Sequence, residues 1–245
     1  MQEIENHRKR VAAERREKMR ARLQESALQL IAEEGIATFS IDRLIVHAEV
    51  SRGTFYKYYD APHALIRELA LLISNELISN AEILVVQIED PAVRIAFGLR
   101  ALMHTCRANP VLGYFLVHLG WHDITQQHLM FDYVKRDLIQ AKKLKRFSEV
   151  TTELALSLIG ASAIAGIQFM MKSPKKHGNS PEETAAAILR ALGMGAQESE
   201  QIANLPMPKI RLPDTGLIHR VTNLARLRVE KTNSDKLVSP SGHLA

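Results

Sequence analysis

The chemically richest stretch of the chain runs from Ser51 to Tyr58 and concentrates arginine, lysine, threonine and tyrosine in one short segment. Phe55 and Tyr59 are four residues apart, which puts both rings on one side of a helix and leaves the polar side chains on the other. Arginine and lysine reach guanine edges or phosphates, and hydroxyl groups donate to phosphates. Such a helix suits a DNA major groove. The candidate contacts are Ser51, Arg52, Gly53, Thr54, Tyr56, Lys57 and Tyr58.

A preceding short helix has to hold this segment in place. Ser40 is a good N-cap, and an apolar face follows it at helical spacing. Glu49 and Val50 then turn the chain, and Ser51 caps the second helix. Ser40 and Arg43, in the first turn of the preceding helix, complete the candidate DNA-binding set. The residues of the apolar face are Ile41, Leu44, Ile45 and Ala48.

This pair of helices resembles the DNA-binding motif of the tetracycline-repressor (TetR) family of bacterial regulators. The match runs without gaps over 35–65, and its most specific part is 50–59. The sequence departs from the family at Glu49, where glycine is usual, and at Pro62, where a phosphate-binding lysine is usual. Glu49 strains the turn if that position needs a positive φ. A surface helical hairpin without a DNA role is the alternative interpretation.

Helical patterns cover the rest of the chain, and no strand-like alternation is present, so the predicted fold class is all-α. We expect a three-helix DNA-binding head with a helix-turn-helix on a larger helical body. The predicted domains are a basic arm (1–22), the helix-turn-helix domain (23–61), a ligand-binding and dimerisation domain (62–204) and a partly disordered extension (205–245). The expected helices are 8–34, 41–48, 52–59, 62–87, 91–107, 110–120, 124–147, 151–172, 181–192 and 215–231.

The net charge of +5 is unevenly distributed along the chain. Eight Lys and Arg against four Glu give the arm +4, whereas three against six acidic residues give 23–60 a charge of −3. The helices that would read DNA are therefore slightly acidic. We expect the arm to supply much of the attraction that does not depend on DNA sequence. A solvated helix start without DNA contact is the alternative.

The apolar stretch 152–171 is rich in alanine and glycine, which let helices approach closely. A helix that is apolar on all sides has to be buried on all sides. Together with 181–192, it could pair with its two-fold mate in a four-helix bundle, which is how proteins that resemble the TetR family dimerise. A monomer with an unusually apolar core helix is the alternative. A membrane span is a weaker interpretation, because the stretch contains several polar and small residues.

The resemblance also implies a pocket for a small effector in the body. Aromatic residues, methionines and histidines gather over 103–133. An apolar pocket with a few polar groups is the usual form of a small-molecule site, although most of these residues could equally belong to the core. The candidate ligand-binding residues are Met103, Phe115, His118, Trp121, Met130 and Tyr133.

Other chemistries have weaker support in the sequence. His118 and His122 are four residues apart, as a metal site on a helix would need, but Gly120 lies between them and no ligand cluster completes a site. No catalytic motif is present, so we expect no enzyme, no catalytic residues, no metal and no cofactor. The remaining alternative is a helical small-molecule or metal-binding protein without DNA function.

The sequence predicts a cytoplasmic protein. The single cysteine, Cys106, excludes an internal disulfide, and the first residues show no secretory signal. The resulting hypothesis is a homodimeric repressor that binds palindromic double-stranded DNA and responds to a small apolar or amphipathic ligand. The extension from 205 begins as a proline-rich linker, and its helix over 215–231 could pack on the partner subunit or stay loose.

Overall fold

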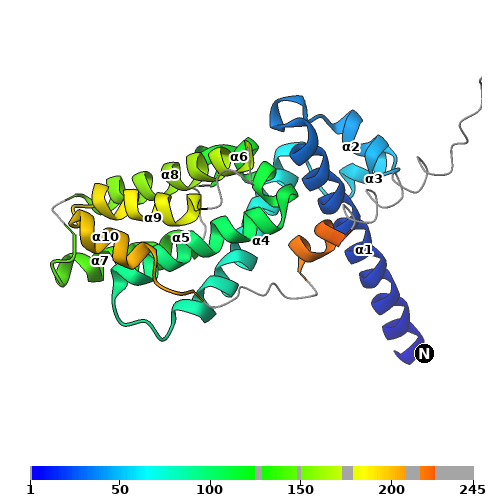
Figure 1. The fold of residues 1–245 in the computed structure, drawn as a ribbon. Helices are drawn as coiled ribbons and strands as arrows, with labels where there is room; N and C mark the ends of the chain where they lie inside the picture. The colour runs from blue at the N-terminus through cyan, green and yellow to red at the C-terminus, as the bar shows by residue number, and fades with distance from the viewer. Residues whose placement is uncertain (1, 125–128, 148–149, 173–178, 208–215, 224–245) are drawn as a thin grey trace, which may run out of the picture.

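The computed structural model describes residues 2–124, 129–147, 150–172, 179–207 and 216–223. These residues form helices joined by short turns, without strands, which confirms the all-α prediction (Figure 1). A helical stretch over 217–223, here called the C-terminal helix, follows the last labelled element. The labelled elements are α1 (Gln2–Glu34), η1 (Ile36–Thr38), α2 (Ile41–His47), α3 (Arg52–Tyr56), α4 (Pro62–Val85), α5 (Pro91–Ala108), α6 (Pro110–Ile124), α7 (Leu129–Lys143), α8 (Thr152–Lys172), α9 (Ser180–Ala191) and α10 (Ala196–Ala203).

The head, residues 23–61, is built around one small apolar core. Leu23, Ile31, Leu44 and Phe55 are completely buried there, so each of the three head helices contributes at least one side chain. As predicted, α1 ends at Gly35, whose φ of 86° belongs to the left-handed region that favours glycine. The Gly35 N–H donates to the Ile31 carbonyl at 2.9 Å and closes the last turn.

Helix α1 is far longer than the head requires. It spans 33 residues and begins at Gln2, six residues before the predicted start. Strong helix formers and charges of alternating sign explain its length, and Lys9 pairs with Glu5 at 2.8 Å one turn apart. Its N-terminal part, in the arm (1–22), projects beyond the head as a helical rod (Figure 1).

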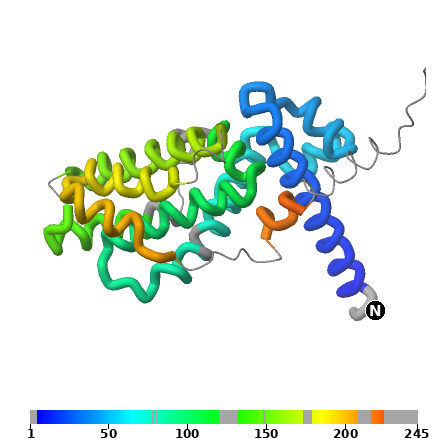
Figure 2. The backbone as a smooth tube through the Cα atoms, viewed as in Figure 1, coloured from blue at the N-terminus to red at the C-terminus, as the bar shows by residue number. Residues whose placement is uncertain are grey.

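Helix α4 leads from the head into the body, where α5 to α10 lie in layers along the long axis of the molecule (Figure 2). Its first turns still belong to the head, because Leu65 and Leu69 are buried in the head core. Further on, Ile73 and Leu77 are buried in the same continuous core, which reaches α5 through Ile95. A movement of α4 would therefore displace packed side chains in both the head and the body.

Two sequence-based boundaries in the body are wrong. Helix α6 does not end near Gly120 but continues to Ile124, and α7 ends at Lys143 rather than at 147. The predicted start of that helix at 124 borders 125–128, which lie outside the described residues. Helix α10 was not predicted, because it is short and starts directly after Gly195, which reads as a stop signal. Its amphipathic pattern is clear in the structure, where Ile202 and Ala203 are buried.

Helix α8 is long and apolar enough to cross a membrane by length and composition alone, and it is the single such helix among the described residues. In this chain one face of α8 packs against α6 and α9, burying Ile159, Ala163 and Ile167. The opposite face stays open, with Leu154 53% and Phe169 49% exposed. Helix α8 therefore has one buried apolar face and one partly exposed apolar face.

Candidate nucleic-acid interface

Two serine caps set the geometry of the helix-turn-helix. Ser40 Oγ accepts from the Arg43 N–H at 3.4 Å, and Ser51 Oγ accepts from the Thr54 N–H at 3.0 Å. Each bond satisfies a backbone donor that the first turn of a helix otherwise leaves free. Both caps were predicted from the sequence. Ser40 and Ser51 therefore have a structural role in addition to any contact with DNA.

The turn between α2 and α3 bends sharply at Glu49. Its φ of 50° lies in the left-handed region, which strains a residue that has a Cβ. The Val50 N–H donates to the Ile45 carbonyl at 2.9 Å, which locks the turn. The Glu49 carboxylate also pairs with Arg22 of α1 at 2.6 Å. This ion pair links the turn to the first head helix.

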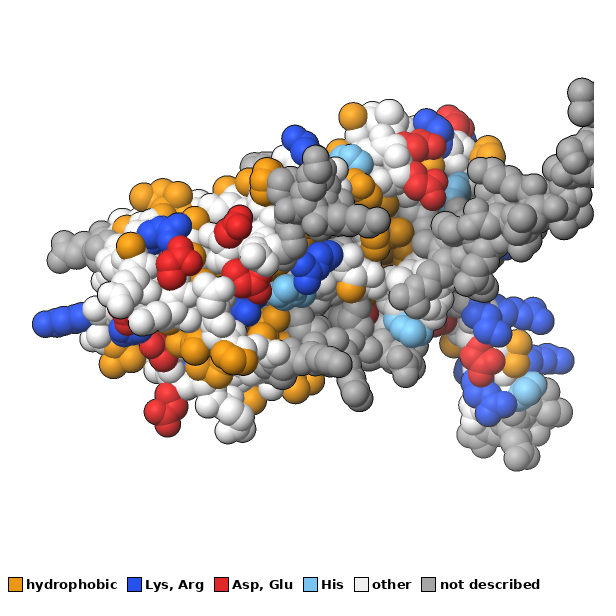
Figure 3. Space-filling model, in the orientation of Figure 1, with side chains coloured by type: hydrophobic (Ala, Val, Ile, Leu, Met, Phe, Trp, Pro, Cys, Tyr) orange, Lys and Arg blue, Asp and Glu red, His pale blue; other side chains and the backbone are white. Residues whose placement is uncertain are grey.

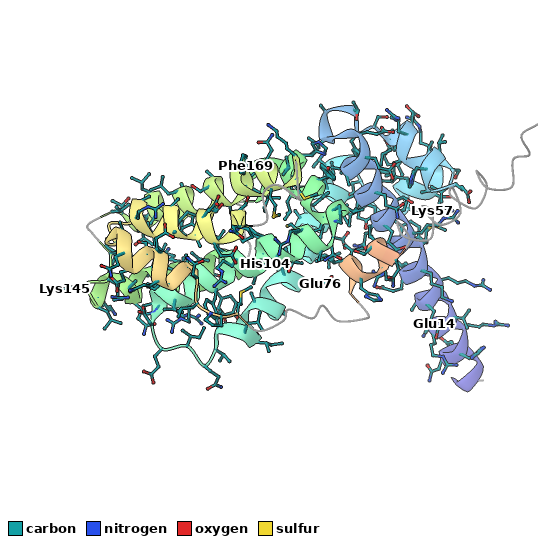
Figure 4. All side chains as sticks on the ribbon, viewed as in Figure 1. Glu14, Lys57, Glu76, His104, Lys145 and Phe169 are labelled. Carbon is teal, nitrogen blue, oxygen red and sulfur yellow. The ribbon has the colours of Figure 1, made fainter. Side chains whose placement is uncertain are left out.

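Helix α3 turns its aromatic stripe inward and its polar groups outward. Phe55 is completely buried and Tyr59 is 5% exposed, whereas Tyr56 is 48% exposed and meets Phe55 edge to face. The helix ends at Tyr56, so Lys57 and Tyr58 lie in the turn that follows rather than inside the helix. The exposed side of α3 and this turn presents Arg52, Gly53, Tyr56 and Lys57. Figure 4 labels Lys57 in the turn after the helix.

The head arginines all have acidic neighbours in the free protein. Arg52 pairs with Asp42, and Arg43 pairs with Glu34 at 2.5 Å. These pairs lie at the surface, where ion pairs contribute little stability because water screens them. The guanidinium groups can therefore exchange a carboxylate for a DNA phosphate or a base edge at small cost. The sequence indicated the cations but not these partners.

The arm and the turn after α3 enclose an open groove of about 680 Å³. Four of its lining residues are basic, and Figure 3 shows Lys and Arg side chains gathered on the projecting rod. Arg20, at the base of the arm, holds the rod to the head, because it pairs with Glu68 at 2.5 Å and lies 5.2 Å from the ring centre of Tyr59. The lining residues are His7, Arg8, Val11, Ala12, Arg15, Arg16, Lys57 and Tyr58.

The candidate ligand residues of the body do not all share one place. Met103 and Phe115 are completely buried in the core. His118 lies at the junction with the head, where its Nδ1–H donates to the Ile31 carbonyl at 2.9 Å. Tyr133, near the start of α7, is partly buried, and the Arg136 guanidinium lies 5.0 Å from its ring centre. The side chains of Trp121 and Met130 lie outside the described part of the structure.

A buried polar network inside the body was not predicted from the sequence. The Arg100 guanidinium donates to Glu182 Oε1 at 3.2 Å and to the Leu205 carbonyl at 2.8 Å. The same Glu182 oxygen accepts from His104 Nε2 at 3.1 Å, and Arg107 donates to His104 Nδ1 at 2.8 Å. The position of Arg100 among the apolar residues of α5 could have predicted this network, since arginine is rarely buried without a partner.

This network fixes the chemical state of His104. Arginine can only donate, so Nδ1 accepts and Nε2 carries the proton, which is the neutral imidazole. Burial lowers the pKa of His104, while the Glu182 carboxylate opposes that shift and Arg107 supports it. Burial likewise raises the pKa of the Cys106 thiol, which keeps it protonated. Among the described residues, no three His, Cys, Asp or Glu side chains come together as a metal site would require.

Comparison with known proteins gives consistent results for both parts of the chain. Residues 23–69 match the family "Bacterial regulatory proteins, tetR family", and residues 90–205 match "Tetracyclin repressor-like, C-terminal domain". Among curated proteins, no significant match was found.

Solved structures show the same architecture. RolR in complex with resorcinol is 29% identical, with a TM-score of 0.65, over 81% of this chain and 100% of RolR. RolR without ligand matches at 29% identity and a TM-score of 0.63, over 78% and 100%. A putative tetR family transcription regulator from Shewanella sp. PV-4 is 17% identical, with a TM-score of 0.63, over 71% and 97%.

Proposed function

Because this chain belongs to the tetR family of bacterial regulatory proteins, we propose that it is a cytoplasmic, homodimeric repressor released from DNA by a small apolar or amphipathic molecule. The observation that carries this proposal is the outward face of α3. A buried aromatic stripe holds the helix while Arg52, Tyr56 and Lys57 remain exposed. No catalytic function is assigned to any residue.

The proposed DNA contacts divide by chemistry. Arg52 and Lys57 read base edges or hold phosphates, and the Tyr56 hydroxyl donates to a phosphate. A Cβ added at Gly53 would meet no protein atom closer than Ser51 Oγ at 3.9 Å, so packing within the fold does not require glycine there. Its missing side chain leaves the backbone of α3 free to approach the DNA. Ser40, Arg43, Ser51, Thr54 and Tyr58 complete the set and border the same face.

The open face of α8 supports a dimer. Leu154 and Phe169 are exposed at its two ends, while the exposed positions between them include the small residues Ala161 and Ala165. Helix α9 exposes Ala187 beside it. Small residues flanked by large apolar ones let two copies of 152–171 and 181–192 pack closely as a four-helix bundle. A symmetric pair of heads then reads a palindrome.

The effector proposal rests on the body and on its likeness to RolR, which was solved with resorcinol and without ligand. We propose Met103, Phe115, His118, Trp121, Met130 and Tyr133 as the residues that respond to the effector. A small ring compound is compatible with the apolar surroundings of Met103 and Phe115. His118 would report the effector to the head through its bond to Ile31.

Footprinting on DNA flanking the protein's own gene tests this function. We expect two protected half-sites about 35 Å apart, or a multiple of that distance, and binding that weakens as salt rises. A matched chain carrying Arg52→Ala and Lys57→Ala serves as the control. If the wild-type protein shows neither protection nor a salt-dependent shift, the chain is a helical ligand-binding protein without DNA function.

The arm offers a separate test of the same function. Replacing Arg8, Arg15 and Arg16 by glutamine should flatten the dependence of log K on log salt by about 0.9 for each lost phosphate contact. Base preference should stay unchanged, because the reading helix is intact. Lys9→Gln, just outside the groove lining, is the matched control. An unchanged slope in the triple variant would show that the arm does not meet DNA.

A further inference from the structure

We propose that residues 216–223 form a brace that fixes the angle between the DNA-binding head and the body. Glu76 and Arg220 supply its two charged contacts. Its effect on DNA binding depends on the function proposed above, but its mechanical role does not. The head and the body are otherwise connected by α4 and by the contact between α1 and α6. We call this connection the joint, and the brace crosses it. Figure 1 shows this helix, in orange, lying between α1 and α4.

The C-terminal helix is anchored by apolar burial. Leu217 is 5% exposed, Ile218 2% and Val221 1%, and all three belong to the continuous core of the molecule. Burial of these side chains against the rest of the chain stabilises the helix in this position.

Glu76 of α4 caps this helix from another part of the chain. Its Oε2 accepts from the Ile218 N–H at 3.3 Å, where a helix start presents unpaired donors and a partial positive charge. Gly216 makes the approach possible, because a Cβ at that position would collide with the Glu76 carboxylate. Figure 4 shows Glu76 directed at the C-terminal helix. Burial raises the pKa of Glu76, while its bonds to this backbone oppose the shift.

Two further contacts connect the helix to both sides of the joint. Arg220 Nε donates to Glu25 of α1 at 2.6 Å, which is a contact with the head. Thr222 Oγ1 donates to Asn109 Oδ1 at 2.9 Å, at the end of α5 in the body. With Glu76 on the connecting helix, one short element is thus bonded to the head, the connector and the body.

A hollow of about 570 Å³ beside the brace shows where relative motion would be taken up. It is bordered by α1, α4 and the C-terminal helix, through residues that include Arg20, Glu68, Glu76 and Arg220. A rotation of α1 against α4 would change the shape of this hollow and break the pair between Arg220 and Glu25. The brace therefore stabilises one head angle against others, and any effector that moves the head has to work against it.

Distances between spin labels test the brace without DNA. Labels at Ala37→Cys in the head and Lys143→Cys in the body are introduced into the full-length chain, mixed with excess unlabelled protein so that a dimer holds one labelled copy. Both positions are exposed, while the natural Cys106 is buried. We expect Gly216→Val, Glu76→Gln and Arg220→Glu each to broaden or shift the head-to-body distance distribution. Glu82→Gln, on the same helix and paired with Arg136 instead, should leave it unchanged.

A charge exchange makes the test specific. Adding Glu25→Arg to Arg220→Glu restores the ion pair with reversed polarity and should restore the wild-type distribution. In the operator assay the single variants should bind about tenfold more weakly or respond to effector at lower concentration. Wild-type distances in both Gly216→Val and Arg220→Glu would overturn the brace, and so would a double variant no better than the single one. Lack of operator binding by the wild type would instead overturn the proposed function alone.

Discussion

The two arginines of the head and two arginines of the body, Arg94 and Arg100, lie in opposite surroundings. In the head, the side chains of Arg52 and Arg43 are 53% and 49% exposed, and their partners Asp42 and Glu34 are 70% and 28% exposed. In the body, Arg100 is 6% exposed and Arg94 11% exposed, and both donate to acceptors inside the fold. Arg52 and Arg43 can therefore exchange their carboxylate partners for other groups, whereas Arg100 and Arg94 are held by acceptors inside the fold.

The difference separates binding from stability. Surface pairs contribute roughly 0–1 kcal/mol, so the head arginines can be released for DNA without weakening the fold. A buried pair is different, since removing one partner leaves an uncompensated charge in a poorly solvated place. We therefore expect substitutions in the head to change DNA affinity and substitutions in the body to change the free energy of unfolding.

The largest expected effect is the loss of Arg100. Arg100→Met leaves Glu182 and the Leu205 carbonyl without their guanidinium donor, and should lower the free energy of unfolding by about 3–5 kcal/mol. Urea unfolding measures this change. Arg43→Met in the head is the matched control and should stay within about 1 kcal/mol of the wild type. Equal losses in the two variants would remove the contrast between the regions.

Next in size is the effect of the reading face on DNA affinity. Arg52→Ala and Lys57→Ala should each weaken operator binding by about 1–3 kcal/mol, because a base or phosphate contact is lost. Their unfolding free energies should change by less than about 0.5 kcal/mol. Tyr56→Phe should weaken binding evenly across DNA sequences, as the loss of a phosphate contact does. Wild-type operator affinity in all three variants would contradict the assignment of α3.

A smaller effect is expected at the turn of the head. Glu49 holds a φ of 50°, which costs a residue with a Cβ on the order of 1–3 kcal/mol. Glu49→Gly removes that strain, loses the exposed pair with Arg22 and adds flexibility to the unfolded chain, for a net gain of about 1 kcal/mol. Glu49→Gln keeps the strained φ but removes the ion pair with Arg22, so its unfolding free energy measures the contribution of that pair alone. A destabilised glycine variant would show that the pair outweighs the strain.

The smallest effect concerns the pH dependence of the body. Because the folded pKa of His104 is lowered, the unfolded chain binds its proton first as the pH falls below the ordinary value near 6.5. Stability should therefore be lost progressively below that pH and be unaffected by this group above it. Chemical unfolding between pH 7.5 and 5 checks the sign, and His104→Gln should remove this part of the slope. A stability that rises on acidification in step with His104 would contradict the neutral assignment.

The head was largely predictable because its determinants are local. Ser40 and Ser51 cap helices that begin one residue later, and Gly35 and Glu49 occupy the two turns that need a positive φ. Each of these features depends on neighbours within a few residues. The resemblance to a known motif then supplied the role of the exposed side chains, which spacing alone does not give.

The body and the extension depend on distant partners, and here the predictions were less complete. Gly120 looks like a stop signal, yet α6 passes through it to Ile124. The pair formed by Arg100 and Glu182 joins residues 82 positions apart, and the pair formed by Arg220 and Glu25 joins residues 195 apart. No local pattern encodes such a choice of partner. The helix predicted over 215–231 was found over 217–223, packed on its own chain, and the rest of it lies outside the described residues.

Under the proposed function, the length of α1 bears on how much of the DNA duplex the protein covers. At about 1.5 Å per residue, the rod before Arg22 extends roughly 30 Å from the head, comparable to about nine base pairs of duplex. If the proposed DNA binding places this rod along the duplex, the protein would cover more sequence than its reading helices touch. Promoter elements in that flanking stretch would then be inaccessible to polymerase, and the length of α1 would constrain the spacing between operator and promoter.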